Sequence, residues 1–155
     1  MSYNTIIIPL DQALQDYAVA WQLLVEAEAL EPTQMPGWVE AICKAFEVYD
    51  SVEVWCALDD QKELMSIIPF LRKQNTMYGI PVKSIELITN IISYHNIPSG
   101  TPRDPALFTL FLETIDQWDM CIIPNLVVEN PAYPELLHVL HSQKHFVHEL
   151  ATVVS

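Results

Sequence analysis

The residues best suited to chemistry lie together in one irregular segment. Residues 90–104 show neither helical nor strand periodicity, and they include Ser93, Tyr94, His95, Asn96 and Arg103. An imidazole titrates near neutral pH, so His95 beside Tyr94 can exchange a proton with a bound substrate. Irregular loops at strand ends are also where α/β proteins place their sites. We therefore expect His95 and Tyr94 as catalytic candidates and Ser93, Asn96 and Arg103 as substrate contacts. The alternative is a loop whose polar groups satisfy its own backbone.

Four histidines near the end of the chain recur at spacings of three, four and three residues. On one uninterrupted helix, His138, His141, His145 and His148 would share a face and could bind a transition metal through neutral imidazoles. Residues 144–146 look like a helix exit, however, and β-branched residues follow them. We therefore expect the helix to end near residue 143, which leaves two histidines on one face and no metal site.

The three cysteines, Cys43, Cys56 and Cys121, lie far apart in apolar surroundings. An odd, widely spaced set is neither a disulfide framework nor a zinc motif. Free cysteine is among the most buried residue types, so we expect buried, unreactive thiols. Trp38, Trp55 and Trp118 are expected to anchor the core, with an exposed interface position as the alternative for Trp55.

Composition limits the class of protein. The 155 residues include 20 acids and 7 bases, for a net charge of −13, and 51% of them are hydrophobic. This predicts one domain over residues 1–155 with a substantial core. Because the bases do not cluster, nucleic acid and anionic membrane are not expected as partners. No apolar stretch reaches the length of a signal peptide or membrane span, which predicts a cytoplasmic protein.

The hydrophobic pattern predicts an alternation of strands and helices. Runs that are β-branched or alternate in polarity predict strands, and apolar spacings of three and four predict helices. In chain order we expect a strand over 4–10, helices over 11–31 and from 36, strands over 52–58, 64–72 and 82–89, a helix over 104–117, a strand over 120–128, a helix from 130 or 133, and a strand over 146–154. This order predicts an α/β fold with a mixed central sheet and helices on both faces.

The expected hairpin of residues 52–58 and 64–72 contains an irregularity at Pro69. Proline cannot donate a hydrogen bond to a neighbouring strand, which implies a bulge, a strand end or an edge at that point. After the hairpin, residues 74–79 are expected to form the turn that leads to the next strand.

Three short motifs resemble those of a known family. They are a Pro-x-Trp segment at Pro36–Trp38, a Pro-hydrophobic-basic run within Ile68–Lys73, and a Ser-Tyr-x-Asn segment at Ser93–Asn96. With the order of elements, they resemble the N-terminal module of the FemAB-like, or BioF-like, acyltransferases of the GNAT superfamily. The resemblance implies a GNAT-like fold and one half of a tandem, whose second module or inter-module cleft handles donor and acceptor. The chain departs from the family at Ser93 and Asn96, where acids are expected.

Members of the superfamily that use coenzyme A hold its pyrophosphate on backbone N–H groups of a glycine-rich turn at a helix start. This chain has three well-separated glycines, Gly37, Gly79 and Gly100. Residues 100–105 contain two prolines, which lack an N–H group, and Asp104 places a negative charge at the positive end of the expected helix. We therefore expect no cofactor held in the usual way, and acyl-CoA is the ligand to test.

Three functions follow. The first is an acyltransferase-related domain that is the non-catalytic half of an enzyme, or a stand-alone remnant, and binds a second GNAT module or another protein. The second is an active N-acyltransferase whose amine-bearing acceptor is attracted by the acidic surface and deprotonated near His95. The third is a homo-oligomeric interaction protein without catalysis, a homodimer in its simplest form, which buries surplus apolar surface.

Overall fold

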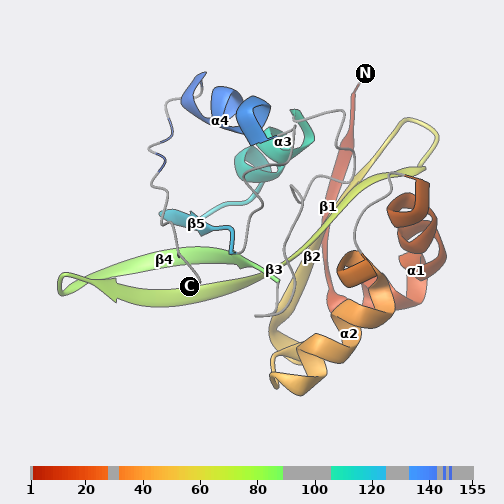
Figure 1. Ribbon diagram of the computed structural model, residues 1–155, viewed down its shortest axis with the longest axis horizontal. Helices are drawn as coiled ribbons and strands as arrows, with labels where there is room; N and C mark the ends of the chain where they lie inside the picture. Colours follow the sequence, from red (N-terminus) through yellow and green to blue (C-terminus); the bar gives the residue numbers. More distant parts are fainter. Residues whose placement is uncertain are drawn as a thin grey trace, which may run out of the picture.

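The computed structural model describes residues 2–27, 32–88, 106–124 and 133–142, together with His145 and Val147. The strands are β1 (Asn4–Pro9), β2 (Val52–Leu58), β3 (Leu64–Met77), β4 (Ile80–Leu87) and β5 (Met120–Ile122). The helices are α1 (Leu10–Ala27), α2 (Pro36–Ala45), α3 (Ala106–Thr114) and α4 (Tyr133–Ser142), with single 3-10 turns η1 (Pro32–Gln34) and η2 (Tyr49–Ser51) (Figure 1).

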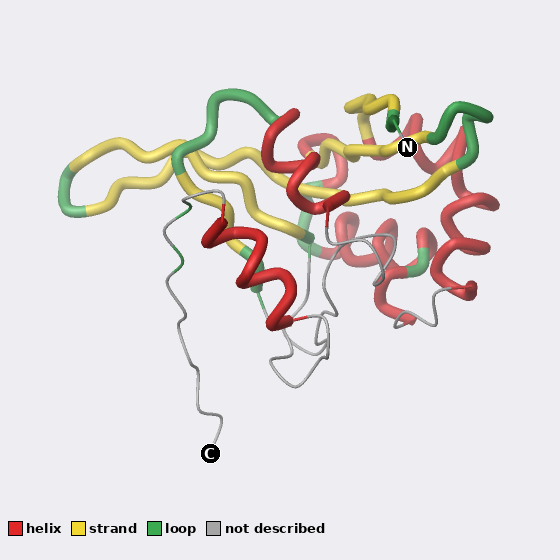
Figure 2. Tube along the Cα trace, turned by 90° about the horizontal axis from the view of Figure 1, so that it is seen from above, coloured by secondary structure: helices red, strands yellow, loops and turns green. Residues whose placement is uncertain are grey.

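The strands form one mixed sheet in the order β1-β2-β3-β4-β5. The first three neighbouring pairs are antiparallel, and β5 returns parallel to β4 after the chain has passed through α3. Helices α1 and α2 cover one face of the sheet, and α3 and α4 lie on the other (Figures 1 and 2). The predicted α/β fold with a mixed sheet and helices on both faces is confirmed.

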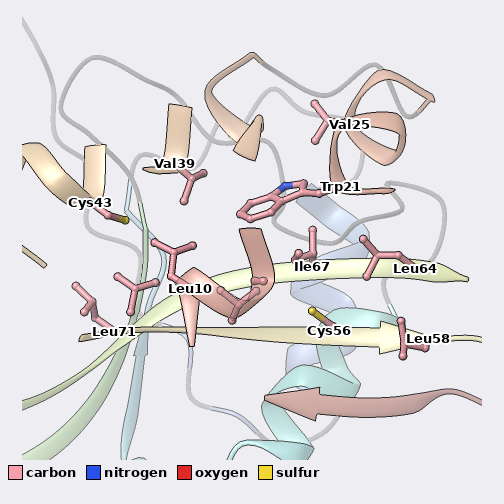
Figure 3. Packing of buried hydrophobic residues seen from close by; sticks show 13 residues of the cluster. Leu10, Trp21, Val25, Val39, Cys43, Cys56, Leu58, Leu64, Ile67 and Leu71 are labelled. Carbon is pink, nitrogen blue, oxygen red and sulfur yellow. The ribbon is translucent and has the colours of Figure 1, made fainter. Parts of the chain in front are cut away.

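The core under α1 follows from the apolar stripe predicted for that helix. Its residues Trp21 and Val25 are 2% exposed and pack against the alternate side chains of β2 and β3. Figure 3 shows the Trp21 ring over the sheet, with Ile67 of β3 and Cys56 of β2 below it. The helix begins at Leu10, one residue before the predicted start at residue 11, and its described part ends at Ala27.

The predicted inward face of α2 is wrong by one position. The helix begins at Pro36 as expected, but it buries Val39 and Cys43. Trp38, expected in the core, is 44% exposed, and Phe46 at the end of the helix is also exposed. Both faces of this segment are apolar, so helical spacing alone cannot distinguish them.

The second core lies between the sheet and α3. Trp55 is completely buried there, and its ring meets Phe111 edge-on at 5.6 Å, as Phe70 does. The indole Nε1 of Trp55 donates a hydrogen bond of 2.7 Å to Thr114 Oγ1. The exposed alternative for Trp55 is therefore wrong, because α3 covers what the sequence presents as the polar face of β2.

The expected turn over residues 74–79 is also wrong. Strand β3 runs to Met77, β4 begins at Ile80, and only Tyr78 and Gly79 connect them. The register with β2 continues through Pro69, so there is no bulge at the proline; the shift lies at Ala57/Leu58. The Pro69 carbonyl accepts a hydrogen bond from Ile88 just beyond the last β3–β4 pair. Pro69 lies inside β3, so the strand-end interpretation is wrong as well; on the β4 side, Pro69 lies just beyond the last pair, Phe70↔Leu87, where the neighbouring strand ends.

The elements after α3 are shorter than predicted. Helix α3 ends at Thr114 rather than near Gln117, and the indole N–H of Trp118 donates to the carbonyls of Leu112 and Ile115 at its end. Strand β5 ends at Ile122 instead of residue 128, and its residues are only half-buried because it pairs with β4 on one side in the described chain. The predicted strand over 146–154 lies outside the described residues apart from Val147, which is not in a strand.

Helix α4 begins at Tyr133, which confirms the second of the two predicted starts. Its Leu140 packs against the core between the sheet and α3. In the described part of the chain, no helix combines the length and apolarity that crossing a bilayer requires.

Candidate functional site

The five predicted site residues, Ser93, Tyr94, His95, Asn96 and Arg103, all lie outside the described residues, so their roles stay predictions. The structure describes the frame on either side of them. Strand β4 ends at Leu87, and α3 begins at Ala106, close to the helix start predicted at residues 104–105. The ends of β4 and β5 and the start of α3 are therefore the described surroundings of the candidate site.

Strands β4 and β5 are paired over three residues only. Ser84, Ile85 and Glu86 lie opposite Met120, Cys121 and Ile122, after which both strands end within a residue. In sheets with parallel strands, ligands bind outside the carboxyl ends of the strands, where neighbouring chains separate. The end of β4, and Glu86 in particular, is thus the described position nearest to where a ligand would enter such a fold.

Glu86 is held by a cross-strand ion pair. Its Oε2 lies 2.7 Å from Nζ of Lys73 on β3, and its side chain is 29% exposed. Next to it, Ser84 is buried, and its Oγ accepts a hydrogen bond of 2.7 Å from Nδ2 of Asn75. This polar group lies on the sheet face covered by α1 and α2, because Ile85 and Leu87 point to the other face. Sequence reasoning missed it, although Ser84 and Glu86 alternate with the apolar residues of β4.

A second charged group lies on the opposite face of the sheet. Arg72 of β3 donates from Nε to Glu53 Oε2 at 2.7 Å and from Nη1 to the Asp116 carbonyl at 2.9 Å. Its guanidinium also lies 5.6 Å from the Phe70 ring centre. These contacts join β2, β3 and the α3–β5 connection. Arg72 is thus committed to positioning these elements rather than to a ligand.

Helix α3 carries one unusual polar group near its start. Thr109 is 9% exposed, and its Oγ1 has no hydrogen-bond partner among the described residues. A buried hydroxyl without a partner is unfavourable by about 1–3 kcal/mol.

The histidine series does not form a metal site in the described chain. Helix α4 ends at Ser142, which confirms the predicted end near residue 143. His138 and His141 are exposed on α4, while His145 has left the helix and stacks against Trp118 with ring centres 6.0 Å apart. His148 lies outside the described residues. No three His, Cys, Asp or Glu side chains among those described are arranged to hold a metal ion.

The cysteines are inert by burial, as predicted. Cys43 and Cys56 are fully buried, and Cys121 is partly buried against the α3 core. Burial disfavours the thiolate and raises the pKa of Cys43 to about 11 and those of Cys56 and Cys121 to about 12. A thiol that stays protonated at neutral pH is a poor nucleophile.

Solved structures with the same fold include several acetyltransferases. The chain superimposes on a ribosomal-protein-alanine N-acetyltransferase from Brucella melitensis biovar Abortus with a TM-score of 0.52 and 13% identity, covering 100% of this chain and 99% of the other. A GNAT family acetyltransferase from Staphylococcus aureus gives a TM-score of 0.52 at 7% identity, covering 100% and 98%. A tetramutant Bacillus halodurans protein gives 0.54 at 13% identity, covering 98% and 99%.

These likenesses define the fold of the chain as that of the GNAT acetyltransferases. The alignments with these three structures cover nearly the whole of this chain and of each of the other chains. No family model matches the sequence, and no curated protein is similar to it in sequence.

Proposed function

We propose that this chain is an acyltransferase-related GNAT domain with a binding role, either the non-catalytic half of a FemAB-like or BioF-like enzyme or a stand-alone remnant of one. Its partner is a second GNAT module or another protein. The fold supports the relation to acyltransferases, and the chemistry at the start of α3 supports the binding role.

The start of α3 is the observation that carries the proposal. The helix begins at Ala106, so the residues just before it are Asp104 and Pro105. Proline contributes no N–H group, and a carboxylate at a helix N-terminus occupies the position that would attract a phosphate. No glycine lies between Gly100 and the helix to let a pyrophosphate approach the backbone closely. This end of α3 is therefore a poor pyrophosphate site.

The described charges at the end of β4 also favour binding over catalysis. Glu86 lies at the position where a general base would meet an acceptor, but its carboxylate is bonded to Lys73 at 2.7 Å. A carboxylate that is bonded to a lysine ammonium group must first break that ion pair before it can take a proton from a substrate, which makes it a less effective general base.

Thermal unfolding with acetyl-CoA, free coenzyme A and a long-chain acyl-CoA tests the proposal. We expect no change in Tm with any of them. Binding at one hundred times Kd would stabilise the fold by about 2.7 kcal/mol, which is readily measured, and such a shift would overturn the proposal. A catalytically active GNAT acetyltransferase treated in parallel serves as the positive control.

An active N-acyltransferase is the second candidate, favoured by the half-buried position of Glu86 at the carboxyl end of β4. In that case an amine-bearing acceptor would be attracted by the acidic surface and would approach Glu86 or His95. Turnover of acetyl-CoA with a panel of amines, lost in Glu86→Gln and His95→Gln, would favour this candidate over the first.

A further inference from the structure

The distal half of the β3–β4 hairpin extends away from the rest of the described molecule. We call residues 72–83 the arm. The β3–β4 pairs run from Arg72↔Ile85 to Met77↔Ile80. The pairing of β3 with β2 ends at Leu71, and β5 pairs with β4 only from Ser84 onward, so neither strand flanks the arm. Figures 1 and 2 both show it projecting at one end of the longest axis. An isolated two-stranded ribbon is marginally stable in water and leaves both its outer edges unpaired.

The tip of the arm is apolar and exposed. Tyr78 is 100% exposed and Ile80 is 64% exposed, and Met77 beside them is also exposed. Tyr78 and Gly79 have φ of 51° and 80°. Positive φ at both central residues is the signature of a type I′ turn, which favours asparagine or glycine at the first position. Tyrosine is thus an unfavourable choice for the turn, and its side chain reaches only solvent in the isolated chain.

The arm is also free of acids in a strongly acidic protein. Residues 64–85 contain Arg72, Lys73 and Lys83 and no acid, so all 20 acids and the other four of the seven bases lie elsewhere. The acids that contact the arm do so at its root. They are Glu53, Glu86, Asp116 and Asp119, of which Asp119 accepts from the backbone N–H of Lys83. The arm can therefore approach an acidic surface without like-charge repulsion.

Helix α1 offers such a surface. Its solvent face presents Val19 and Leu23, which are 75% and 60% exposed and lie one turn apart. Asp16 and Glu26 continue the same face on either side, and the helix contains no base. The face therefore has an apolar centre between two carboxylates. The arm is its complement, with an apolar tip at Tyr78 and Ile80 and the exposed Lys83 nearer its root, opposite Gln74.

We propose that the arm of one copy docks on the solvent face of α1 in a second copy, which makes the chain a homodimer. The arm and α1 lie at opposite ends of the longest axis, so a two-fold rotation can bring each arm onto the partner's α1 (Figures 1 and 2). Such an interface is closed and uses the same two surfaces in both copies. Specific interfaces bury about 800 Å² on each partner, and two arm–helix contacts contribute to that area together. The inference is independent of acyl-CoA binding and of catalysis.

Tyr78→Asn is the sharpest test. It removes the exposed ring but gives the turn an Asn-Gly sequence, which suits type I′, so the fold is not weakened. We expect the wild type to be a dimer by sedimentation equilibrium at micromolar concentration, and the variant to have a dimer Kd at least about tenfold higher. Its Tm, measured at a concentration where both proteins are monomeric, should not fall. Phe46→Asn removes another exposed aromatic residue from α2 and should leave the Kd unchanged.

A charge exchange tests the partner surface. Lys83→Glu and Glu26→Lys should each weaken the dimer, and the double variant should recover affinity, because the two charges then attract again. Lys62→Glu changes the same charge in the β2–β3 turn and should not weaken it. A wild type that stays monomeric at high concentration would overturn the proposal, as would a dimer unaffected by Tyr78→Asn or a double variant no tighter than the single ones.

Discussion

The same substitution, Thr→Val, at two positions of α3 measures how much a threonine hydroxyl contributes to the stability of the helix on the sheet. Thr114 Oγ1 accepts from the buried Trp55 indole at 2.7 Å and donates to the Leu110 carbonyl at 2.7 Å. Thr109 Oγ1 is buried and has no hydrogen-bond partner within the described part of the chain. Threonine and valine have nearly the same shape, so Thr→Val changes mainly the hydroxyl in both cases.

Thr114→Val should destabilise the protein. It leaves the indole N–H of a residue with 0% exposure unpaired, which costs about 1–3 kcal/mol. Thr109→Val should be neutral or stabilising by up to about 1 kcal/mol, because the lost hydroxyl made no hydrogen bond and the new methyl group is buried. In a domain of this size each kcal/mol moves Tm by about 2–4 °C.

Urea unfolding followed by tryptophan fluorescence measures both variants against the wild type, and constant m-values would show that the unfolding transition is comparable. A Trp55→Phe, Thr114→Val double variant should cost much less than the sum of the two single variants, since both remove the same hydrogen bond. The reasoning is refuted if Thr109→Val is as damaging as Thr114→Val, because the Thr109 hydroxyl would then contribute to stability like a bonded group.

Three further predictions concern charge, pH and backbone strain. Arg72→Ala should lower the free energy of unfolding by about 1 kcal/mol at low salt and by less in 1 M NaCl, since Arg72 bonds Glu53 and Asp116 at a partly exposed site; urea unfolding at the two salt concentrations checks this. Burial raises the pKa of Cys56 from 9.0 to about 12, so the folded state keeps a proton that the unfolded state loses. Stability should therefore be constant up to about pH 9 and fall above it, and a Cys56→Ala variant, although less stable, should show a shallower fall in pH-dependent unfolding. Gln117→Gly should raise Tm by a few degrees, because Gln117 has φ of 57°; a lowered Tm would mean that its side chain is needed.

The order of strands and helices could be predicted because each element has its own period. Strand β2 was predicted with its observed bounds, since Val52, Val54, Cys56 and Leu58 alternate with their neighbours. The pattern failed where both faces of an element are apolar. Trp55 and Trp38 are of one residue type, yet α3 covers the first and no described element covers the second. Which face is covered depends on tertiary packing, which a local pattern does not contain.

The length of the β3–β4 hairpin was missed for a different reason. Polar residues such as Gln74, Asn75 and Thr76 were read as a turn, but they continue β3 because both faces of the arm meet solvent. A strand exposed on both sides shows no alternation of apolar and polar residues. The same exposure makes the arm available to a second copy. The sequence pattern therefore mispredicts the structure of the segment that we propose as the interface.

The fold shared with the GNAT acetyltransferases and the proposed loss of pyrophosphate binding depend on different residues. The two cores around β2 and β3 and the ion pairs of Arg72 and Lys73 stabilise the sheet without a ligand. Asp104 and Pro105, on which the proposal depends, precede α3 in the sequence, whereas Phe108 and Phe111 of the helix pack together in the described core. Because these two properties depend on different residues, donor binding can be lost while the fold remains as a platform for surfaces such as the arm. Replacing residues 104–105 with glycines should therefore leave the melting temperature within a few degrees of the wild type, whether or not coenzyme A binding appears.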